Sequence, residues 1–376
     1  MKVFVFVKNK LNSTDTVVPL LLELNNKFSI TSELVVFDQW AYEGINNNHV
    51  IYDVINNVGS INFLSKGINN KIIRRFFILT GLMKIFLYVT IGKAKIFHFG
   101  FFDTGILRIS AKLFGDRIFR LQGNAYNTTF DQYDKTLNRK VNSFLISNGN
   151  IILFDGKVKG MNLEKGKKIG VYNFGPTRTR SYWVNYIKSK DSFYFNKYHK
   201  GVDISRGVIV FMVGLIDKNG YSTSIEKGGK YDLFNQTINV LSNKASIPVF
   251  IKPHVTTDVK LVNNKISKLD NFFITYLHPN ILSLHARVVI ANQFSNTLAD
   301  AYSYGVPTIE FTNYKKSLLE ATNGCSCEPK YVTHFINNDI DKFKKAISTI
   351  VDYNYSDTNF NGYEKNNTSL FKEINK

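Results

Sequence analysis

Two short polar groups in this sequence could together bind a phosphoryl group. The first comprises Lys252, Pro253 and His254, and the second comprises Ser295, Asn296 and Thr297. The first offers a cation and an imidazole on a chain that proline stiffens. The hydroxyl of Ser295 can cap a following helix, and the N-terminus of a helix attracts anions. A structural explanation stays open for each group, as a turn for the first and a simple helix cap for the second.

Carboxylates and arginines in the first half of the chain are further candidates. Asp103 and Asp131 lie in loops that we expect after strands, where a carboxylate can act as general base towards a substrate hydroxyl. A helix cap or a turn is the alternative role for either of them. Arg178 and Arg180 stand beside aromatic residues and could hold a phosphate or a carboxylate, or form a solvated rim.

A loop rich in glycine, serine and threonine contains Ser222 and Thr223. Its backbone N–H groups could surround a phosphate. The loop matches neither the P-loop nor the dinucleotide fingerprint, so we take it only as a candidate nucleotide contact. Cys325 and Cys327, with His334 as the one further ligand nearby in the sequence, are too few for a zinc site, and we expect no metal.

The elements that must position these residues alternate between strands and helices. Strands are predicted at Lys2–Val7, Ser32–Phe37, Lys95–Phe99, Asp116–Leu121, Asn150–Phe154, Lys167–Tyr172, Gly207–Val213, Ile247–Ile251, Phe272–Tyr276, Arg287–Ala291 and Thr308–Phe311. Helices are predicted at Thr16–Asn25, Ile106–Phe114, Tyr231–Leu241 and Ile340–Val351. The Asn-rich stretches Gly44–Asn48 and Asn56–Gly59 are predicted to be turns or exposed loops. This alternation predicts an α/β protein with parallel sheets covered on both faces.

The segment Arg287–Phe311 is predicted to form a strand, a turn, a helix and a second strand. Ser295 begins the helix, one face of which carries Leu298, Ala301 and Tyr302 towards the sheet. Gly305 ends it in a left-handed conformation, and Pro307 prevents its continuation. Open α/β sheets bind ligands at the carboxyl ends of their strands, which is where this turn lies.

Length and charge set the outer bounds. A chain of 376 residues suits two domains, and we predict residues 1–180 and 206–345 as the domains, 181–205 as a linker, and 346–376 as a tail that packs back on the first domain. The formal net charge of +19 favours an anionic partner: nucleic acid, a membrane surface, or phosphorylated and acidic sugars. The charges are scattered and no RNA-binding or helix-turn-helix signature is present, so nucleic acid is not expected.

Compartment and membrane contact are predicted from three features. The start, MKVFVFVKNK, is predicted to be a buried strand rather than a secretory signal, and the paucity of cysteine suits a reducing, cytoplasmic setting. Phe76–Gly92 is too short, and interrupted by Lys84, to span a membrane. We expect it to be a buried helix, and the alternative is a helix whose face touches the cytoplasmic leaflet.

A resemblance to known enzymes rests on IPVFIKPH and, further along, on VVIANQFSNTLADAYSYGVPTIEF. Over roughly 207–313 the chain resembles the nucleotide-binding domain of GT-B glycosyltransferases, and is similar to bacterial enzymes of capsule and lipopolysaccharide synthesis, among them the polysialyltransferase and Kdo-transferase groups. In those groups a His-Pro element and a Ser/Thr-rich turn contact the phosphate of a CMP-sugar. The matching positions are His254, Ser295, Asn296 and Thr297. Val255 replaces their usual proline, and the pattern also occurs in UDP-sugar enzymes such as the UDP-N-acetylglucosamine 2-epimerases.

The resemblance implies a GT-B fold, with two Rossmann-like domains facing each other across a cleft. It implies a glycosyltransferase that moves a sugar from a nucleotide-sugar co-substrate, CMP-linked slightly before UDP-linked, to a hydroxyl of a growing surface glycan. Lys252 and His254 would bind the phosphates, and Glu310 would lie near a ribose or sugar hydroxyl. No metal and no cofactor would be needed, and the acceptor would be a glycan, free or lipid-linked, at the cytoplasmic face of the inner membrane. The alternatives are a sugar 2-epimerase of the same fold, a glycerophosphotransferase that consumes CDP-glycerol, and a non-enzymatic polyanion-binding protein.

Overall fold

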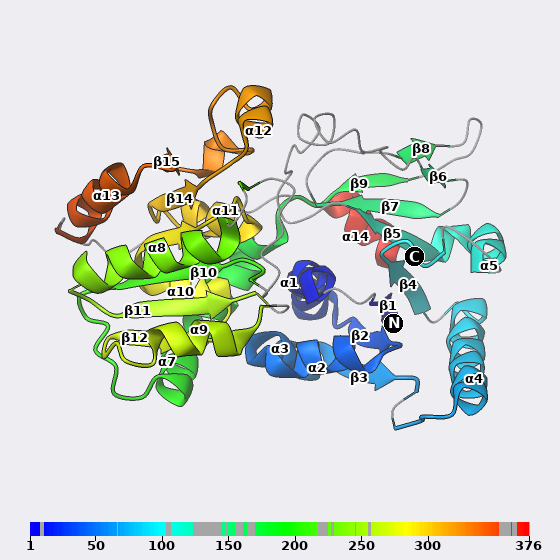
Figure 1. Ribbon diagram of the computed structural model, residues 1–376. Coiled ribbons are helices and arrows are strands. Elements are labelled where there is room, and N and C mark those ends of the chain that lie inside the picture. The colour runs from blue at the N-terminus through cyan, green and yellow to red at the C-terminus, as the bar shows by residue number, and fades with distance from the viewer. Residues whose placement is uncertain are drawn as a thin grey trace. The chain divides into compact units, whose positions relative to one another are not determined.

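The computed structural model describes residues 1–7, 11–65, 67–92, 94–102, 107–122, 144–146, 149–154, 161–163, 170–216, 225–226, 229–244, 246–254, 257–352, 362 and 367–375. The described chain forms two compact units, which are taken separately below (Figure 1). The first lies within Met1–Asn127, Val141–Trp183 and Gly362–Lys376, and the second within Val184–Asn361.

The first unit is built on a parallel sheet of seven strands in the order β3-β2-β1-β4-β5-β7-β9. Its strands are β1 (Lys2–Phe6), β2 (Thr31–Val36), β3 (Gly59–Phe63), β4 (Ala94–His98), β5 (Ile118–Gln122), β7 (Asn150–Leu153) and β9 (Val171–Asn173). A separate parallel pair consists of β6 (Phe144–Ile146) and β8 (Met161–Leu163). The parallel sheet predicted from the alternating pattern is therefore confirmed.

The Asn-rich stretches of the first unit are helical, so the prediction of turns or exposed loops there was wrong. α2 (Gln39–Asn47) covers the first stretch except Asn48, and α3 (His49–Val58) covers the second except Gly59, which begins β3. Asp38 and Asn48 cap these two helices with their side chains. The inward face of α3 buries Val50, Ile51, Val54, Ile55 and Val58. This apolar spacing of three and four residues outweighs the low helix propensity of asparagine.

Four other helices of the first unit are α1 (Leu11–Phe28), α4 (Lys71–Thr90), α5 (Leu107–Leu113) and α14 (Thr368–Asn375). Phe371 of α14 packs against Phe28 and Phe174, with ring centroids 5.2 and 6.4 Å apart, so this C-terminal helix belongs to the first unit. α4 was expected to be a buried helix, and that was wrong, because only Ile85 and Val89 on it are buried. Among the described residues, no helix has both the length and the apolar character that crossing a membrane demands.

The second unit is built on a parallel sheet of six strands in the order β12-β11-β10-β13-β14-β15. Its strands are β10 (Val208–Val213), β11 (Val249–Pro253), β12 (Phe272–Ile274), β13 (Ala286–Ala291), β14 (Thr308–Thr312) and β15 (His334–Asn337). Its helices are α7 (Ser181–Tyr198), which begins three residues inside the first unit, α8 (Gly229–Lys244), α9 (Val259–Ile266), α10 (Pro279–His285), α11 (Asn296–Ser303), α12 (Lys316–Ala321) and α13 (Ile340–Asp352). α7 occupies most of the segment expected to be a linker.

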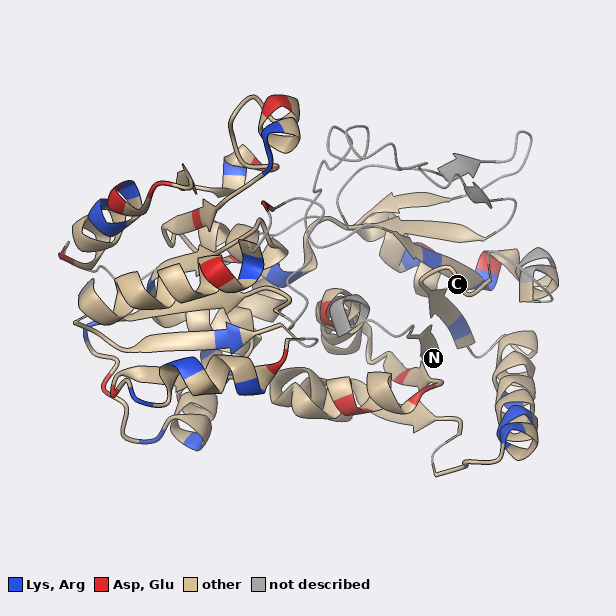
Figure 2. Cartoon of the chain, viewed as in Figure 1, with Lys and Arg blue, Asp and Glu red and all other residues tan. Residues whose placement is uncertain are grey.

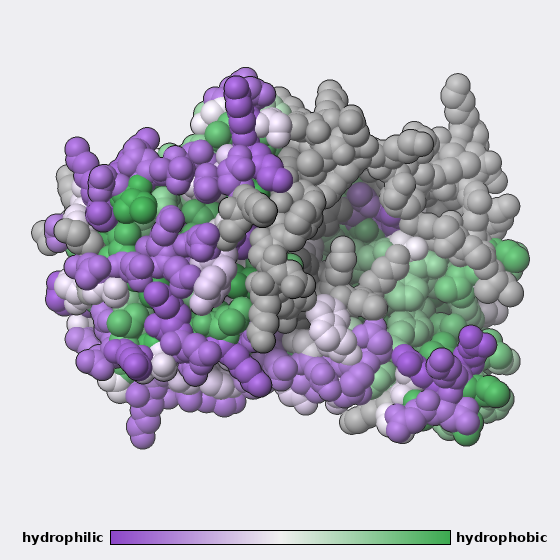
Figure 3. Space-filling model, viewed as in Figure 1, coloured by the Kyte–Doolittle hydropathy of each residue, from purple (hydrophilic) through white to green (hydrophobic). Residues whose placement is uncertain are grey.

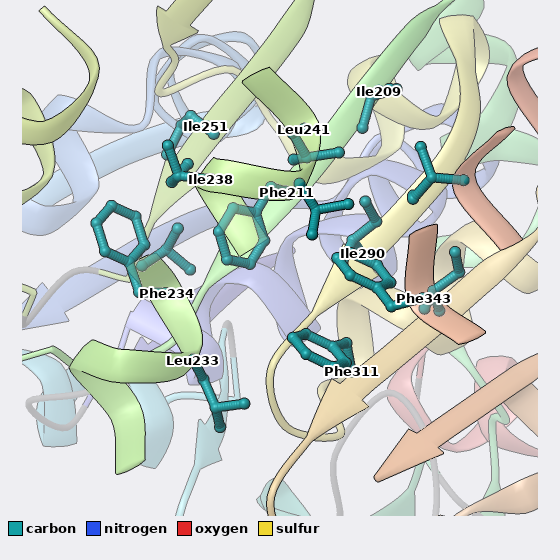
Figure 4. Packing of buried hydrophobic residues seen from close by; sticks show 14 of the residues in the cluster. Ile209, Phe211, Leu233, Phe234, Ile238, Leu241, Ile251, Ile290, Phe311 and Phe343 are labelled. Carbon is teal, nitrogen blue, oxygen red and sulfur yellow. The ribbon is translucent and has the colours of Figure 1, made fainter. Parts of the chain in front are cut away.

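The core of the second unit lies between this sheet and the helices α8, α9 and α13. β10 contributes Ile209 and Phe211, and α8 contributes Phe234, as seen from close by in Figure 4. The rings of Phe311 and Phe343 stack with centroids 4.3 Å apart, which joins α13 to β14. Burial of these side chains fixes the strands, and through them the loops at the carboxyl ends of the strands.

Candidate functional site

The two predicted polar groups lie at the same edge of the second sheet. The strand register pairs Lys252 with Met212, and Met212 with Ala291. Lys252 and Ala291 therefore stand in one row across the sheet, separated only by β10. Neighbouring strands lie about 4.8 Å apart, so the two backbones are about 10 Å apart, a distance that one diphosphate can bridge. The strands are parallel, so the chain that leaves β11 at His254 and the turn that leaves β13 emerge on the same side.

This edge is also the point at which the strand order reverses. From β10 the chain adds β11 and then β12 on one side, and returns to place β13 on the other side of β10. Loops at such a reversal diverge to opposite faces of the sheet and leave a crevice between them. Lys252 and His254 stand at the end of β11 on one side of β10, and Ser295 follows β13 on the other side. The first sheet has the same reversal between β1 and β4.

The turn after β13 is shaped by Ser295. This residue is the N-cap of α11, with extended backbone angles, and its Oγ accepts a hydrogen bond of 3.3 Å from the Thr297 N–H. Ser295 Oγ also lies 2.9 Å from Thr297 Oγ1. The predicted cap is therefore confirmed. It leaves the first turn of α11, the positive end of the helix dipole, at the carboxyl edge of the sheet.

The end of α11 follows the prediction in its backbone but not in one side chain. Gly305 has a φ of +79°, and Val306 N–H donates to the Ala301 carbonyl over 3.0 Å, which closes the helix in a left-handed turn. Leu298 and Ala301 are buried as expected, whereas Tyr302 remains 40% exposed. The Tyr302 ring packs edge-on against Tyr331, with ring centroids 5.9 Å apart.

Glu310 fixes the backbone of this turn through a hydrogen bond. It is completely buried, and one of its carboxylate oxygens accepts from the Phe294 N–H over 2.9 Å and from the Tyr314 hydroxyl. Burial raises the pKa of Glu310, and hydrogen bonds from Ser326, Tyr314 and Phe294 offset part of that rise. Contact of Glu310 with a ribose or sugar hydroxyl stays a prediction, but its partners in the structure position the residue before Ser295. Sequence reasoning missed Tyr314, which stands four residues after Glu310 in an ordinary strand-to-helix loop.

Asn292, which sequence reasoning also missed, fixes the first residue of the same turn. Its side-chain amide donates to Thr237 Oγ1 over 2.9 Å and to the Phe311 carbonyl over 3.0 Å. The turn is thus tied to α8 on one side and to β14 on the other. An anion site on this turn would be largely preformed, because its backbone is fixed by neighbouring elements.

The chain after Lys252 is fixed to the exit of β10. His254 N–H donates to the Val213 carbonyl over 2.8 Å, and Thr257 Oγ1 donates to the Gly214 carbonyl over 2.7 Å. The side chain of His254 is exposed, and that of Lys252 is half-buried. Desolvation of the part of the ring that packs against the protein, followed by the positive charge of Lys230, lowers the pKa of His254. The lowered pKa favours the neutral imidazole, which can donate one hydrogen bond to a phosphate.

Lys230 is a third basic residue of this region, and no local pattern singled it out. It lies in the first turn of α8, directly after the loop that leaves β10. The unit therefore carries three basic side chains towards its carboxyl edge, on β11, after β11 and on α8. In Figure 2, blue residues are visible on β11 and at the start of α8.

The two arginines of the first unit form ion pairs inside the protein. Arg180 binds Glu23 through two hydrogen bonds, of 2.6 Å from Nε and 2.8 Å from the guanidinium terminus. Arg178 is paired with Asp15. Both arginines are only 5% exposed. Binding of a ligand by them stays a prediction, but in the structure they join α1 to the segment that follows β9.

The other residues predicted for the site are not placed at this sheet edge by the structure. Asp103, Asp131, Ser222 and Thr223 lie outside the described residues. His278, which is followed by Pro279, is fully buried as the cap of α10. Within the part of the chain that the structure describes, no three His, Cys, Asp or Glu side chains gather as they would around a metal ion.

No protein-family model and no curated protein matches this chain. Among solved structures it is similar to the UDP-N-acetylglucosamine 2-epimerase of Rickettsia bellii, at 11% identity over 94% of this chain and 89% of that chain, with a TM-score of 0.51. It is similar to the UDP-GlcNAc 2-epimerase of Methanocaldococcus jannaschii, at 10% identity over 100% and 99%, with a TM-score of 0.51. It is also similar to LpCGTa, solved in complex with UDP, at 8% identity over 94% and 90%, with a TM-score of 0.51. The fold is therefore the predicted one: α/β, with the two Rossmann-like sheets of the GT-B architecture.

Proposed function

We propose that the chain is an enzyme that binds a nucleotide sugar at the carboxyl edge of the second sheet and transfers its glycosyl group to a hydroxyl of a growing surface glycan. The observation that carries the proposal is the shared row of Lys252 and Ala291 on either side of β10. Because of this row, we place the phosphates between Lys252 and His254 on one side of β10 and the capped N-terminus of α11 on the other side. In this proposal residues 206–345 bind the nucleotide sugar and residues 1–180 bind the acceptor.

The chemistry needs stabilisation of the leaving nucleotide. As the bond between the sugar and the phosphate breaks, the departing phosphate oxygen gains negative charge. Lys252, the imidazole N–H of His254 and the first turn of α11 stabilise that charge. Since these groups are fixed before the reaction, they need little reorganisation. The acceptor hydroxyl loses its proton to a carboxylate, for which Asp103 and Asp131 remain the proposed bases.

The nucleotide is the first point to test. The similarity to an enzyme solved with UDP favours UDP, whereas the motif around His254 favours CMP. Isothermal titration of the whole chain with UDP and with CMP in parallel should give micromolar to millimolar binding of one of them, and binding should be about tenfold to a hundredfold weaker in Lys252→Met. Absence of binding for both nucleotides and for their sugar conjugates would refute the proposal.

A UDP-sugar 2-epimerase is the second candidate, because two of the similar structures are such enzymes. It would use the same phosphate site but needs no acceptor. Incubation with UDP-N-acetylglucosamine alone, followed by proton NMR of the anomeric region, separates the two activities. Formation of the 2-epimer supports the epimerase, whereas turnover that requires an added glycan supports the transferase.

A further inference from the structure

Helix α4 of the first unit presents a continuous apolar stripe to solvent. The stripe comprises Ile72, Phe76, Leu79, Met83 and Leu87, which are 79, 62, 57, 64 and 63% exposed. Their spacing of four, three, four and four residues places them on one side of the helix. Single exposed apolar residues are ordinary, but an aligned row of five large ones marks a surface that another body covers.

The opposite side of α4 already has a partner. Ile85 and Val89 are buried there against Phe4 and Ile96 of the first sheet, together with the half-buried Ile78. This contact accounts for the folding of the helix onto the unit. The outer stripe adds nothing to that contact, so its apolar character needs a separate cause.

The apolar surface continues onto α5. Phe86 of α4 and Phe114, directly after α5, stack with ring centroids 6.4 Å apart, so the two helices are neighbours. Ile109 and Leu113 of α5 are 57 and 71% exposed. Figure 3 shows green, hydrophobic residues gathered over this side of the molecule, next to purple, hydrophilic ones.

The charges on α4 are of one sign. The helix contains Lys71, Arg74, Arg75 and Lys84 and no acidic residue, and Figure 2 shows only blue among its charged residues. Lys71, Arg75 and Lys84 are exposed, while Arg74 turns inward and donates to the Phe37 carbonyl over 2.7 Å. The exposed cations flank the apolar stripe, an arrangement that suits a surface which is apolar within and anionic at its boundary.

We propose that α4, together with the exposed face of α5, docks on the surface of an anionic phospholipid bilayer. α4 lies in the plane of the interface, with the outer stripe among the acyl chains and the three exposed cations at the phosphate groups. A second copy of the chain is a poorer occupant, because a symmetric pairing of α4 would bring like charges together. The inference goes beyond the proposed function and does not depend on it.

The test is co-sedimentation of the whole chain with vesicles of phosphatidylcholine, alone or mixed with phosphatidylglycerol. The wild type should bind the anionic vesicles and bind the neutral ones weakly. Phe76→Ser with Met83→Ser should lower the partition coefficient about tenfold or more for each side chain. The matched control, Phe193→Ser with Tyr276→Ser, removes aromatic side chains that are 56 and 53% exposed in the second unit and should bind as the wild type does.

A second pair of variants tests the charge. Arg75→Glu with Lys84→Glu should abolish the preference for phosphatidylglycerol, whereas Lys316→Glu with Lys345→Glu, the same change on the second unit, should keep it. Circular dichroism should show all variants folded, since every altered residue is exposed. The proposal is overturned if the wild type ignores both vesicles or if the stripe variants bind equally well. It is also overturned if sedimentation without lipid shows a wild-type dimer that the stripe variants lose.

Discussion

Glu23 in the first unit and Glu310 in the second are both fully buried carboxylates, but their partners differ. Glu23 binds two cations, the guanidinium of Arg180 and the ammonium of Lys27. Among the described residues, the donors to Glu310 are neutral, the Tyr314 hydroxyl and the Phe294 N–H among them. The first arrangement neutralises a buried charge within the unit. The second leaves the protonation state of the carboxylate dependent on pH, and the hydrogen bonds of the carboxylate fix the shape of a loop.

The basic residues of the two units differ in the same way. Arg180 is 5% exposed and holds two parts of one unit together, whereas Lys252 is half-buried and His254 exposed at a sheet edge. A cation that is buried against a carboxylate is needed for folding, and one that reaches solvent beside a helix N-terminus can bind a ligand. Substitutions in the two units should therefore affect different measurements.

Replacement of Arg180 should have the largest effect on stability. Arg180→Met leaves Glu23 buried with Lys27 as its one remaining cation among the ion pairs of the described residues, and should lower the free energy of unfolding by about 3 kcal/mol. Urea denaturation followed by circular dichroism measures this. Lys27→Met removes the more exposed partner of the same carboxylate and should cost less than about 1 kcal/mol. Equal losses in the two variants would contradict the assignment of Arg180 as the main partner.

Replacement of Lys252 should instead affect ligand binding. Lys252→Met keeps the apolar stem but removes the charge, and should weaken binding of the preferred nucleotide about tenfold to a hundredfold. The unfolding free energy should change by less than about 1 kcal/mol. Lys265→Met, at another half-buried lysine of the same unit, is the matched control for titration calorimetry. A similar loss of affinity in both variants would mean that net charge, rather than this site, governs binding.

Ser295 allows the cap to be separated from the anion site. Ser295→Ala should lower the unfolding free energy by about 1 kcal/mol, because the first turn of α11 loses its acceptor. Ser295→Asp keeps an acceptor and so most of the stability, yet should abolish nucleotide binding by placing a negative charge beside the phosphate. Asp38→Ala, which removes the cap of α2 in the first unit, should reduce stability alone. Retained nucleotide binding in Ser295→Asp would exclude this turn from the site.

Periodicity and turn chemistry predicted the part of the fold around the candidate site. The capped turn at Ser295, the left-handed Gly305 and the strand before Lys252 all follow from local signals, since each depends on residues that are adjacent in the sequence. Local signals also predicted a shared sheet edge, because the carboxyl ends of parallel strands lie together. The order of the strands, which sets the distance between Lys252 and Ala291, is decided by packing between distant segments.

The wrong predictions have the same cause. Asparagine content suggested loops where α2 and α3 form, because the apolar faces of those helices are buried by a sheet that local patterns do not reveal. For Arg178 and Arg180 the alternative of a solvated rim was wrong, because both are buried against Asp15 and Glu23, which lie far from them in sequence, whereas ligand binding stays a prediction. The apolar length of α4 suggested burial, whereas its outer stripe is exposed. In each case the environment depends on whether a segment distant in the sequence covers the residues, and local patterns do not reveal this.

Substitution of Glu310 should have the smallest effect on the free energy of unfolding, and measurements at several pH values are needed to detect it. Because burial raises its pKa above the usual value of 4.5, the folded state binds the proton more tightly than the unfolded chain does. The contribution of Glu310 to stability is therefore fully present below pH 4.5 and is lost as the pH rises through the raised pKa of the folded state. The slope for one carboxyl group cannot exceed about 1.4 kcal/mol per pH unit.

Glu310→Gln should remove this pH dependence. The amide oxygen of the glutamine can still accept from the Phe294 N–H and the Tyr314 hydroxyl, so the turn before Ser295 keeps its shape. Urea denaturation of both proteins over a series of pH values should show the wild type losing stability relative to the variant as the pH rises. Parallel curves would mean that the Glu310 carboxylate is stabilised to the same extent as the Glu23 carboxylate. The contrast between the two buried carboxylates would then not hold, because a neutral hydroxyl and an amide would be replacing a guanidinium at no cost.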